Sequence, residues 1–353
     1  MNLNRDLAIL FVSSHFPSWR QLRLSDPMTG SGIRAARYAL EATNVGKVVA
    51  SDRDTDAVEL AEQTVRLNMV EGKVSVILSE AHTHLSNQAC ERFDLIDLDP
   101  FGSPAPFFES SLRATADGGV LAATATDMGP LSGARPAACI RKYGVFAIRT
   151  EFEKEMAIRA MGSCMASIGA RLELGISVAF SHASDHYARL YAAVAKGRKA
   201  ANESLRKLGF ILYCPKCLTR TTSQSLSSIR THCENCSSVI SIGGPIWLGP
   251  LWNSQTVTAM VQNTPTLVSN RLSEIQKMLS SIQAEADSAQ FYYTTDATAA
   301  KFGTKPPSIP SLLAALTENG YQASRTHFNP SGFRTDAPVK EIATLFRAIS
   351  NKA

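Results

Sequence analysis

Short apolar runs alternate with stretches of helical periodicity over the first 200 residues of the chain. The apolar runs predict strands, and the stretches between them, with apolar side chains three or four positions apart, predict helices. Strands separated by helices indicate helical crossovers and a parallel sheet, and so a doubly wound α/β domain. The predicted strands are 47–52, 73–78, 93–99, 118–127 and two more between 170 and 195, and the clearest helices are 32–42 and 56–69.

The pattern changes in the last third of the chain. The sequence there predicts a basic linker or helix at 197–209, a Gly/Pro/Trp-rich segment at 243–252, helices near 267–285 and 310–319, and a strand at 321–328. A length of 353 residues exceeds one average domain. We therefore expect two domains, residues 1–205 and residues 206–353.

Composition is that of an ordinary globular protein, with 44% hydrophobic and 19% charged residues. No apolar stretch approaches the roughly 20 residues of a membrane span. The N-terminal run LAILFV is too short for a secretory signal, so we expect a cytoplasmic location. The net charge is +5, and the excess of basic side chains lies in residues 206–353, with 14 basic and 8 acidic residues. This bias weakly favours a polyanionic partner.

The segment LSDPMTGSGIRAA has the features of a nucleotide-binding turn. Asp26 ends a predicted strand, and Gly30 and Gly32 lie before a helix, whose N-terminus favours negative charge. Asp52 ends the next strand, where an acid can accept hydrogen bonds from ribose hydroxyls. GSGIRA also fits a dinucleotide fingerprint, so a dehydrogenase is an alternative. Asp26, however, suits a cationic amino-acid ligand better than a pyrophosphate, which favours S-adenosylmethionine.

Acidic residues follow several of the predicted strands. Asp26, Asp52, Glu80 and Asp99 should meet at the carboxyl edge of the sheet, where ligands bind in open α/β folds. The alternative is that these acids are ordinary helix N-caps.

The stretch DLDPFGSP ends a buried strand in Asp99, Pro100 and Phe101. A carboxylate and a carbonyl can hold an exocyclic base amine, whose lone pair is otherwise delocalised into the ring. The proline stiffens the turn, and the aromatic ring can stack on a base, worth roughly 1–3 kcal/mol. The stretch therefore predicts an amine-methylation loop; a plain proline turn with a core phenylalanine is the alternative.

Segments spread over nearly the whole chain resemble the archaeal and eukaryotic tRNA (guanine-26-N2)-dimethyltransferases. They are NRDL (4–7), DPMTGSGIRAARYALE (26–41), DLDPFGSP (97–104), TATDMGPLSG (124–133), RKYG (141–144), DHYARLYAAV (185–194), GPIWLGPLW (244–252) and THFNPSGFRTDAP (326–338). The resemblance implies a class I methyltransferase fold that uses S-adenosylmethionine as methyl donor and tRNA as substrate.

The resemblance also implies roles for single residues. Arg5 and Arg34 would contact the donor, Asp52 its ribose, and Glu80 and Ala81 its adenine. Family members often have aspartate where this chain has Glu80. They usually begin further upstream, with an aromatic-Asn-Pro element that helps to close over the target base. This chain begins almost at the NRD motif, so we expect either weaker base capture or a start that lies further upstream.

Four cysteines form the pattern C-x2-C-x15-C-x2-C. This spacing is typical of a zinc site with four thiolate ligands and no open position, so we expect a structural Zn²⁺ held by Cys214, Cys217, Cys233 and Cys236. His327 and Arg334 in the tail fit phosphate contact and packing equally well.

The sequence thus predicts a Rossmann-like S-adenosylmethionine-dependent methyltransferase domain, a zinc-ribbon-like insert and an α+β C-terminal region that binds tRNA. The predicted product is N2-methyl- or N2,N2-dimethylguanosine at tRNA position 26. Alternatives are a methyltransferase acting on another nucleic-acid or protein amine, and a tRNA-binding protein with an inactive donor site. No membrane partner is expected, and no obligate protein partner is evident.

Overall fold

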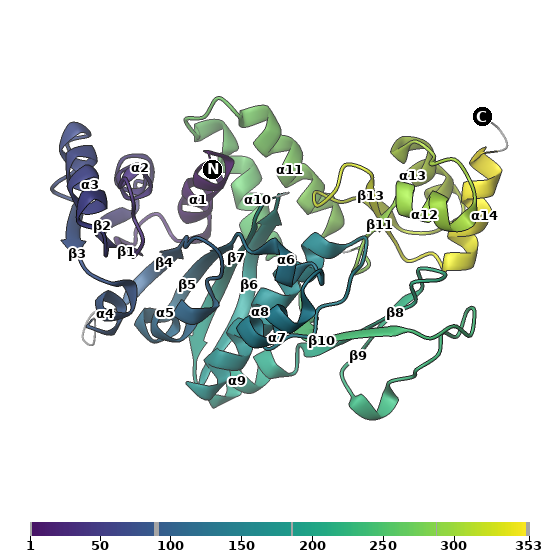
Figure 1. The fold of residues 1–353 in the computed structure, drawn as a ribbon. Coiled ribbons are helices and arrows are strands. Elements are labelled where there is room, and N and C mark those ends of the chain that lie inside the picture. Colours follow the sequence, from purple (N-terminus) through teal and green to yellow (C-terminus); the bar gives the residue numbers. More distant parts are fainter. Residues whose placement is uncertain (1, 88–91, 185, 287, 351–353) are drawn as a thin grey trace.

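The computed structural model describes residues 2–87, 92–184, 186–286 and 288–350. A seven-stranded sheet forms the centre of the N-terminal part, with the strand order β3-β2-β1-β4-β5-β7-β6 (Figure 1). Its strands are β1 (Leu22–Asp26), β2 (Val45–Asp52), β3 (Val74–Leu78), β4 (Phe93–Leu98), β5 (Thr115–Ala125), β6 (Leu174–Ala183) and β7 (Ala188–Lys196).

The sheet is mixed rather than wholly parallel. Strands β1 to β5 pair in parallel, as the alternation of strands and helices predicts, but β7 is antiparallel to both β5 and β6. Strand β7 begins at Ala188, shortly after β6 ends at Ala183. This connection is too short for a parallel pairing of β6 with β7, because parallel neighbours need a crossover of a dozen or more residues.

Helices cover both faces of this sheet (Figure 1). Strand side chains alternate between the two faces: Leu95 joins the hydrophobic cluster under α1 and α2, and Ile96 joins the cluster under α5 and α8. The helices are α1 (Asn2–His15), α2 (Ile33–Glu41), α3 (Thr55–Leu67), α4 (Ala81–Ser86), η1 (Ala105–Phe107), α5 (Phe108–Ala114), α6 (Met128–Leu131), α7 (Pro136–Tyr143), α8 (Glu153–Arg171) and α9 (Arg198–Leu205).

Two small sheets and a set of helices make up the rest of the chain. The sheets have the orders β10-β8-β9 and β11-β13-β12. No helix in the described part of the chain is both long and apolar enough to cross a membrane. The elements are β8 (Leu208–Tyr213), β9 (Arg220–Ser223), η2 (Leu226–Ser228), β10 (Ser241–Trp247), α10 (Ser254–Asn263), η3 (Thr264–Thr266), α11 (Leu272–Glu285), β11 (Tyr293–Thr294), α12 (Thr295–Phe302), α13 (Ile309–Glu318), β12 (Ala323–Arg325), β13 (Gly332–Thr335) and α14 (Val339–Ser350).

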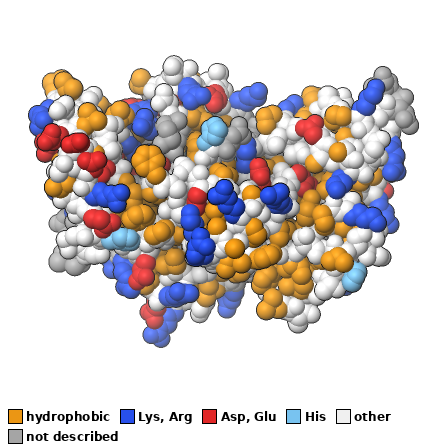
Figure 2. Space-filling view, viewed as in Figure 1, with side chains coloured by type: hydrophobic (Ala, Val, Ile, Leu, Met, Phe, Trp, Pro, Cys, Tyr) orange, Lys and Arg blue, Asp and Glu red, His pale blue; other side chains and the backbone are white. Residues whose placement is uncertain are grey.

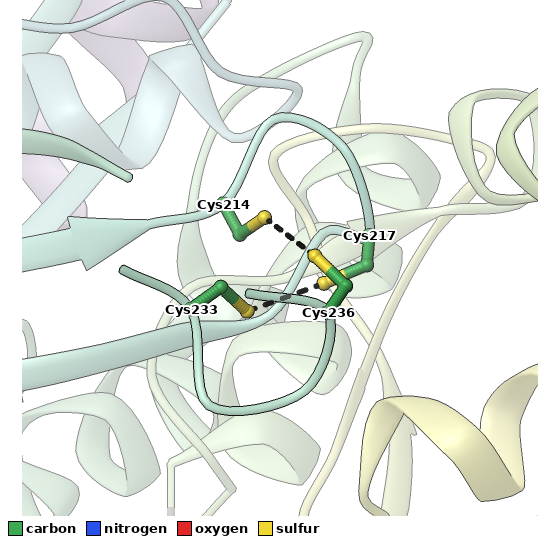
Figure 3. A group of neighbouring side chains, drawn as sticks. All are labelled: Cys214, Cys217, Cys233 and Cys236. Carbon is green, nitrogen blue, oxygen red and sulfur yellow. Dashed lines mark hydrogen bonds between the residues drawn. The ribbon is translucent and has the colours of Figure 1, made fainter. Parts of the chain in front are cut away.

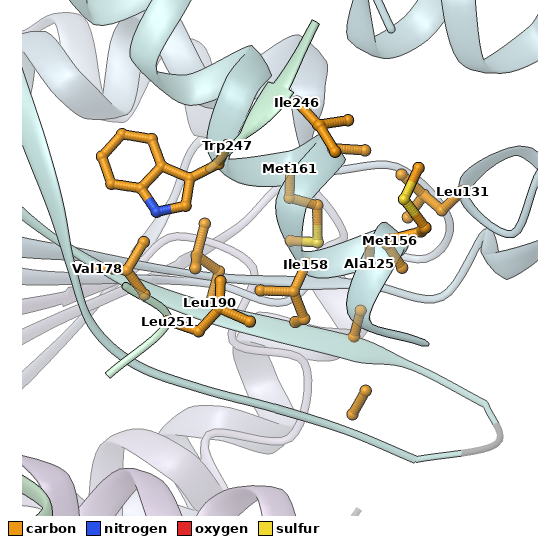
Figure 4. Close-up of a cluster of buried hydrophobic side chains, with 14 of the residues drawn as sticks. Ala125, Leu131, Met156, Ile158, Met161, Val178, Leu190, Ile246, Trp247 and Leu251 are labelled. Carbon is orange, nitrogen blue, oxygen red and sulfur yellow. The ribbon is translucent and has the colours of Figure 1, made fainter. Parts of the chain in front are cut away.

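Hydrophobic side chains from both parts of the chain share common clusters. Trp247 of β10 is fully buried beside Met161 of α8 and Val178 of β6 (Figure 4). A Cβ on Gly162 would lie 3.2 Å from the Cβ of Trp247, so a glycine lets the strand approach the helix. On the other face, α1 packs against α10, where Nδ1 of His15 lies 2.9 Å from Oγ1 of Thr256. Burial of each such large apolar side chain stabilises the fold by about 1.5–3 kcal/mol.

A buried ion-pair network joins α8 to the tail. Arg334 contacts Glu285 at 2.5 Å and Glu155 at 2.9 Å, and Nδ1 of His327 lies 2.5 Å from Glu285. All four side chains are almost inaccessible to solvent. The structure therefore supports a packing role for His327 and Arg334. The alternative prediction, that they contact a phosphate from outside, is wrong for both because their side chains are buried.

Candidate active site and cysteine cluster

A cavity of about 630 Å³ opens at the carboxyl ends of β1, β2 and β4. The sequence-based candidates for donor binding and base handling come from separate segments of the first 101 residues. The structure brings all of them to the wall of this one cavity: Arg5, Asp26, Gly30, Arg34, Asp52, Glu80, Ala81, Asp99, Pro100 and Phe101.

The turn between β1 and α2 depends on its glycines. Gly32 has a φ of 72°, and a Cβ there would lie 2.9 Å from Ala61 of α3, so no larger residue fits. Gly30 has a φ of 54°, and its N–H donates to Oδ2 of Asp52 at 3.0 Å. Asp52 also accepts from the N–H of Asp54 at 3.1 Å. These backbone donors hold the Asp52 carboxylate in place at the cavity wall.

Asp26 is a buried carboxyl group at the end of β1. The hydroxyl of Thr29 donates to it at 2.8 Å. Burial raises its pKa to about 7; Arg34 acts in the opposite direction, and the nearby acids Asp97 and Asp99 add to the rise. The group therefore changes its charge near neutral pH, and a cationic ligand in the cavity would favour its ionised form.

Arg34 of α2 links two carboxylates at the end of β4. Its Nη1 donates to Asp97 at 3.1 Å, and its Nη2 donates to Asp99. Asp97 is fully buried and also accepts from Tyr38 at 2.6 Å and from Arg189 of β7 at 2.7 Å. Burial alone would raise the pKa of Asp97, but Arg189 and Arg34 outweigh it and hold the pKa at about 2.

Arg5 reaches the cavity from α1. Its Nε is buried and has no hydrogen-bond partner in the part of the chain that the structure describes. Burial, followed by the neighbouring Arg34, lowers its pKa, which for an arginine still leaves a cation. An unpartnered guanidinium at a cavity wall is suited to an anionic group such as a carboxylate.

Only one of the four strand-end acids is a helix N-cap. The carboxylate of Glu80 accepts from the N–H groups of His82 and Thr83 at 2.7 and 3.2 Å and so caps α4. The N-cap of α3 is Asp54 rather than Asp52, and the N-cap of α2 is Gly32 rather than Asp26. The N-cap interpretation is therefore wrong for Asp52 and Asp26, whereas Glu80 can line the cavity and cap its helix together.

The loop after β4 presents an aromatic ring at the mouth of the cavity. The side chain of Phe101 is fully exposed, so it is not the core residue that the alternative required. The next residue, Gly102, has a φ of 87°, and its N–H donates to the hydroxyl of Thr126 at 2.7 Å. The N–H of Thr126 in turn donates to the carbonyl of Gly102 at 2.9 Å. The loop is thus clamped to the end of β5 while its ring stays open to stacking.

Several residues at this site are not among the sequence-based candidates. Thr29, Arg53 and Phe107 also line the cavity, and Phe107 stacks on His82 with centroids 4.7 Å apart. Thr29 and Arg53 directly adjoin predicted residues, which was the available signal. Arg189 lies 92 positions from Asp97 along the chain, and no local pattern connects the two.

The four cysteines converge as their spacing predicts. All four Sγ atoms lie within 4.8 Å of one another, with 3.5 Å between Cys214 and Cys236 and between Cys217 and Cys233 (Figure 3). Zn–S bonds of about 2.3 Å in a tetrahedron place the sulfurs about 3.8 Å apart, so the arrangement fits zinc.

The backbone repeats one pattern in both cysteine pairs. The N–H of Leu218 donates to the carbonyl of Cys214, and the N–H of Ser237 donates to the carbonyl of Cys233, both at 2.8 Å. Leu218 and Ser237 both have positive φ, 63° and 55°. Two matching knuckles of this kind point both pairs of thiols at one centre.

Known proteins are similar to this chain in sequence and fold over nearly its whole length. A family model described as N2,N2-dimethylguanosine tRNA methyltransferase matches residues 1–347. A tRNA (guanine(26)-N(2))-dimethyltransferase from Methanothermobacter thermautotrophicus is 33% identical over 99% of this chain and 91% of its own length. A tRNA (guanine(26)-N(2)/guanine(27)-N(2))-dimethyltransferase from Aquifex aeolicus is 32% identical over 97% of this chain and 87% of its own.

Among solved structures, Trm1 from Pyrococcus horikoshii in complex with S-adenosyl-L-methionine superposes with a TM-score of 0.88. It is 32% identical to this chain, and the match covers 97% of this chain and 92% of that one. The match therefore extends well beyond the seven-stranded sheet. The chain belongs to the N2,N2-dimethylguanosine tRNA methyltransferase family.

Proposed function

We propose that this chain transfers methyl groups from S-adenosylmethionine to the exocyclic N2 of guanine at position 26 of tRNA. The products are N2-methylguanosine and N2,N2-dimethylguanosine. The observation that carries the proposal is the loop of Asp99, Pro100 and Phe101, which sets a carboxylate and an open aromatic ring on the wall of the cavity.

The wall of the cavity suits the parts of the donor. We assign the donor's carboxylate to Arg5, its ammonium group to Asp26, its ribose hydroxyls to Asp52, and its adenine to the wall formed by Glu80 and Ala81. Opposite charges and hydrogen-bonding groups thereby face each other. When bound, S-adenosylmethionine supplies an electrophilic methyl group on a cationic sulfur.

Asp99 holds the guanine amine. Its carboxylate can accept an N2 hydrogen, which directs the nitrogen lone pair and reduces its delocalisation into the ring. Arg34 orients this carboxylate through its ion pair, while Phe101 stacks on the base. The guanine must leave its stack in the folded tRNA to reach the loop. Its proton can depart after methyl transfer, so no base with a special pKa is required.

Transfer of labelled methyl groups tests the substrate class. Unmodified tRNA, ribosomal RNA, duplex DNA and a protein mixture are each incubated with the chain and labelled S-adenosylmethionine. Label in tRNA alone is expected. Label in another polymer would favour the alternative amine methyltransferase, and tRNA binding without label would favour a binding protein with an inactive donor site.

Affinity for S-adenosylmethionine should rise with pH because of Asp26. The pKa of Asp26 is about 7 in the folded protein, against an ordinary value of 3.8, so the folded protein binds this proton more tightly than the unfolded chain does. The resulting contribution to the free energy of unfolding is present at low pH and is lost as the pH rises through about 7. A cationic donor prefers the carboxylate, so affinity is expected to increase up to about tenfold per pH unit below about pH 7 and to level off above it. Titration calorimetry measures this. Asp26→Asn should flatten the profile and Asp54→Asn should not; a flat wild-type profile would contradict the assignment.

The cysteine cluster is proposed to hold one structural Zn²⁺ that joins the loop after β8 to the loop before β10. We expect about one zinc ion per chain by elemental analysis, loss of the metal in Cys217→Ser, and a lower melting temperature after chelation. Cys139→Ser is the control, because Cys139 is a buried thiol outside the cluster. Metal-free protein with unchanged stability would contradict the proposal.

On this proposal, residues 206–353 help to hold tRNA. The expected location is the cytoplasm, because both a reduced cysteine cluster and a tRNA substrate fit that compartment.

A further inference from the structure

One basic surface of the protein lies in the N-terminal part, beside the base-handling loop. Residues 128–149 contain four basic side chains and no acidic one, in a chain whose net charge is +5. All four are exposed, together with Ile140 and Phe146, which are each about half exposed. Figure 2 shows Lys and Arg side chains gathered over α6 and α7 in the middle of this face. We name it the α7 surface: Arg135, Arg141, Lys142 and Arg149, with Ile140 and Phe146.

The fold fixes the α7 surface beside the loop that carries Phe101. Thr126, which clamps Gly102, is followed directly by Asp127. Asp127 accepts from Lys142 at 2.9 Å and from the hydroxyl of Tyr143 at 2.6 Å, so it ties the end of α7 to this point. A surface charge on α7 therefore keeps its position relative to the cavity mouth.

A close backbone contact places Arg149 on the same surface. Gly133, between α6 and α7, has a φ of 78°, and a Cβ there would lie 2.3 Å from the carbonyl carbon of Ile148 and 2.7 Å from the N of Arg149. The chain entering α8 is thus held against the start of α7.

The charges of this surface are largely unused within the protein. Lys142 pairs with Asp127, but in the described ranges no ion pair joins Arg135, Arg141 or Arg149 to an acidic side chain. The C-terminal region differs, because Arg220 and Arg334 are buried in ion pairs with glutamates. Part of the basic excess that the sequence suggested for tRNA binding there is therefore internal.

We infer that the α7 surface binds the tRNA phosphates next to the target guanine, an inference that rests on the proposed function. A guanine that enters the cavity stays attached to its strand, so its flanking phosphates must lie at the cavity mouth. Exposed arginines contact phosphates bidentately, and a half-exposed Phe146 can pack on a sugar or base.

Binding of the double variant Arg141→Ala/Arg149→Ala to unmodified tRNA tests the inference. Fluorescence anisotropy is measured over a range of salt concentrations with S-adenosylhomocysteine present. Affinity is expected to fall about tenfold or more, and the slope of log K against log salt to shrink by about 1.5 to 2, roughly one per lost phosphate contact. Affinity for S-adenosylmethionine and the maximal rate at saturating tRNA should stay near wild type.

The charge-matched control is Arg113→Ala/Arg198→Ala. Both arginines are exposed, and both lie at the opposite edge of the sheet, before β5 and after β7. Arg141→Lys/Arg149→Lys keeps the charge and should keep the wild-type salt slope.

Each remaining outcome counts against the inference. An Ala/Ala variant that binds tRNA like the control pair overturns it, and so does a Lys/Lys variant as weak as the Ala/Ala variant, because the side chains would then serve packing. If the unaltered chain binds no tRNA, the proposed function fails and this inference with it. If the unaltered chain binds tRNA and Arg141→Ala/Arg149→Ala binds it with the same affinity, this inference alone is overturned.

Discussion

Asp99→Asn is expected to lower the rate of methyl transfer to tRNA by about 10²–10³-fold, the cost of removing one positioned electrostatic partner of a reacting group. The amide keeps the shape of the side chain but loses the charge and one acceptor oxygen, so it holds the guanine N2 less firmly. The fold should survive, because Arg34 retains its second partner Asp97. Single-turnover kinetics with the protein in excess over tRNA measures the effect on chemistry apart from product release.

Donor binding separates this effect from damage to the cavity. Affinity of Asp99→Asn for S-adenosylmethionine should remain within a few-fold of wild type. Asp117→Asn makes the same chemical change at an exposed acid near the start of β5 and should leave the rate unchanged. A wild-type rate in Asp99→Asn would remove the loop from the mechanism.

Asp97→Ala is expected to destabilise the fold by about 3–5 kcal/mol, because it leaves two buried arginines without their shared partner. Arg34 and Arg189 both pair with Asp97, and none of the three side chains is more than 6% exposed. The phenol of Tyr38 loses its acceptor as well. Equilibrium unfolding in urea measures the change.

The control for this prediction is an ion pair at the surface. Glu62→Ala removes the partner of Arg66, and both side chains are about half exposed. Its cost should be about 0.5 kcal/mol or less, since exposed pairs contribute little. A cost below about 1 kcal/mol for Asp97→Ala would mean that water or another group takes over the role of Asp97.

Local patterns were enough to predict that Asp26, Gly30 and Asp52 meet at one cavity. Asp26 and Asp52 end strands, and Gly30 precedes a helix, so their positions follow from the rule that parallel strands end at one edge. The convergence of the four cysteines was equally predictable, because two C-x2-C pairs at this spacing specify the geometry of a metal site. Family resemblance added Arg5, which comes from a helix that no strand-end argument reaches.

Other features depend on packing and could not be predicted in this way. Helix α8 has buried residues on every face, so it lacks the amphipathic periodicity that identifies a helix. Glu80 is the N-cap of α4. Its position after β3 in the sequence fits a helix cap and a ligand contact equally well. The pairing of Arg189 with Asp97 and the burial of Arg334 follow from tertiary contacts between distant segments.

The most direct test of the central claim is nucleoside mass spectrometry of a tRNA transcript with guanine at position 26, incubated with the chain and S-adenosylmethionine. A matched transcript with adenine at that position is treated in parallel. N2-methylated guanosine is expected in the first transcript and none in the second. Methylated guanosine in both, or a methyl group on another base, would contradict the proposed target; no methylated nucleoside in either, with tRNA and donor both bound, would contradict the proposed reaction.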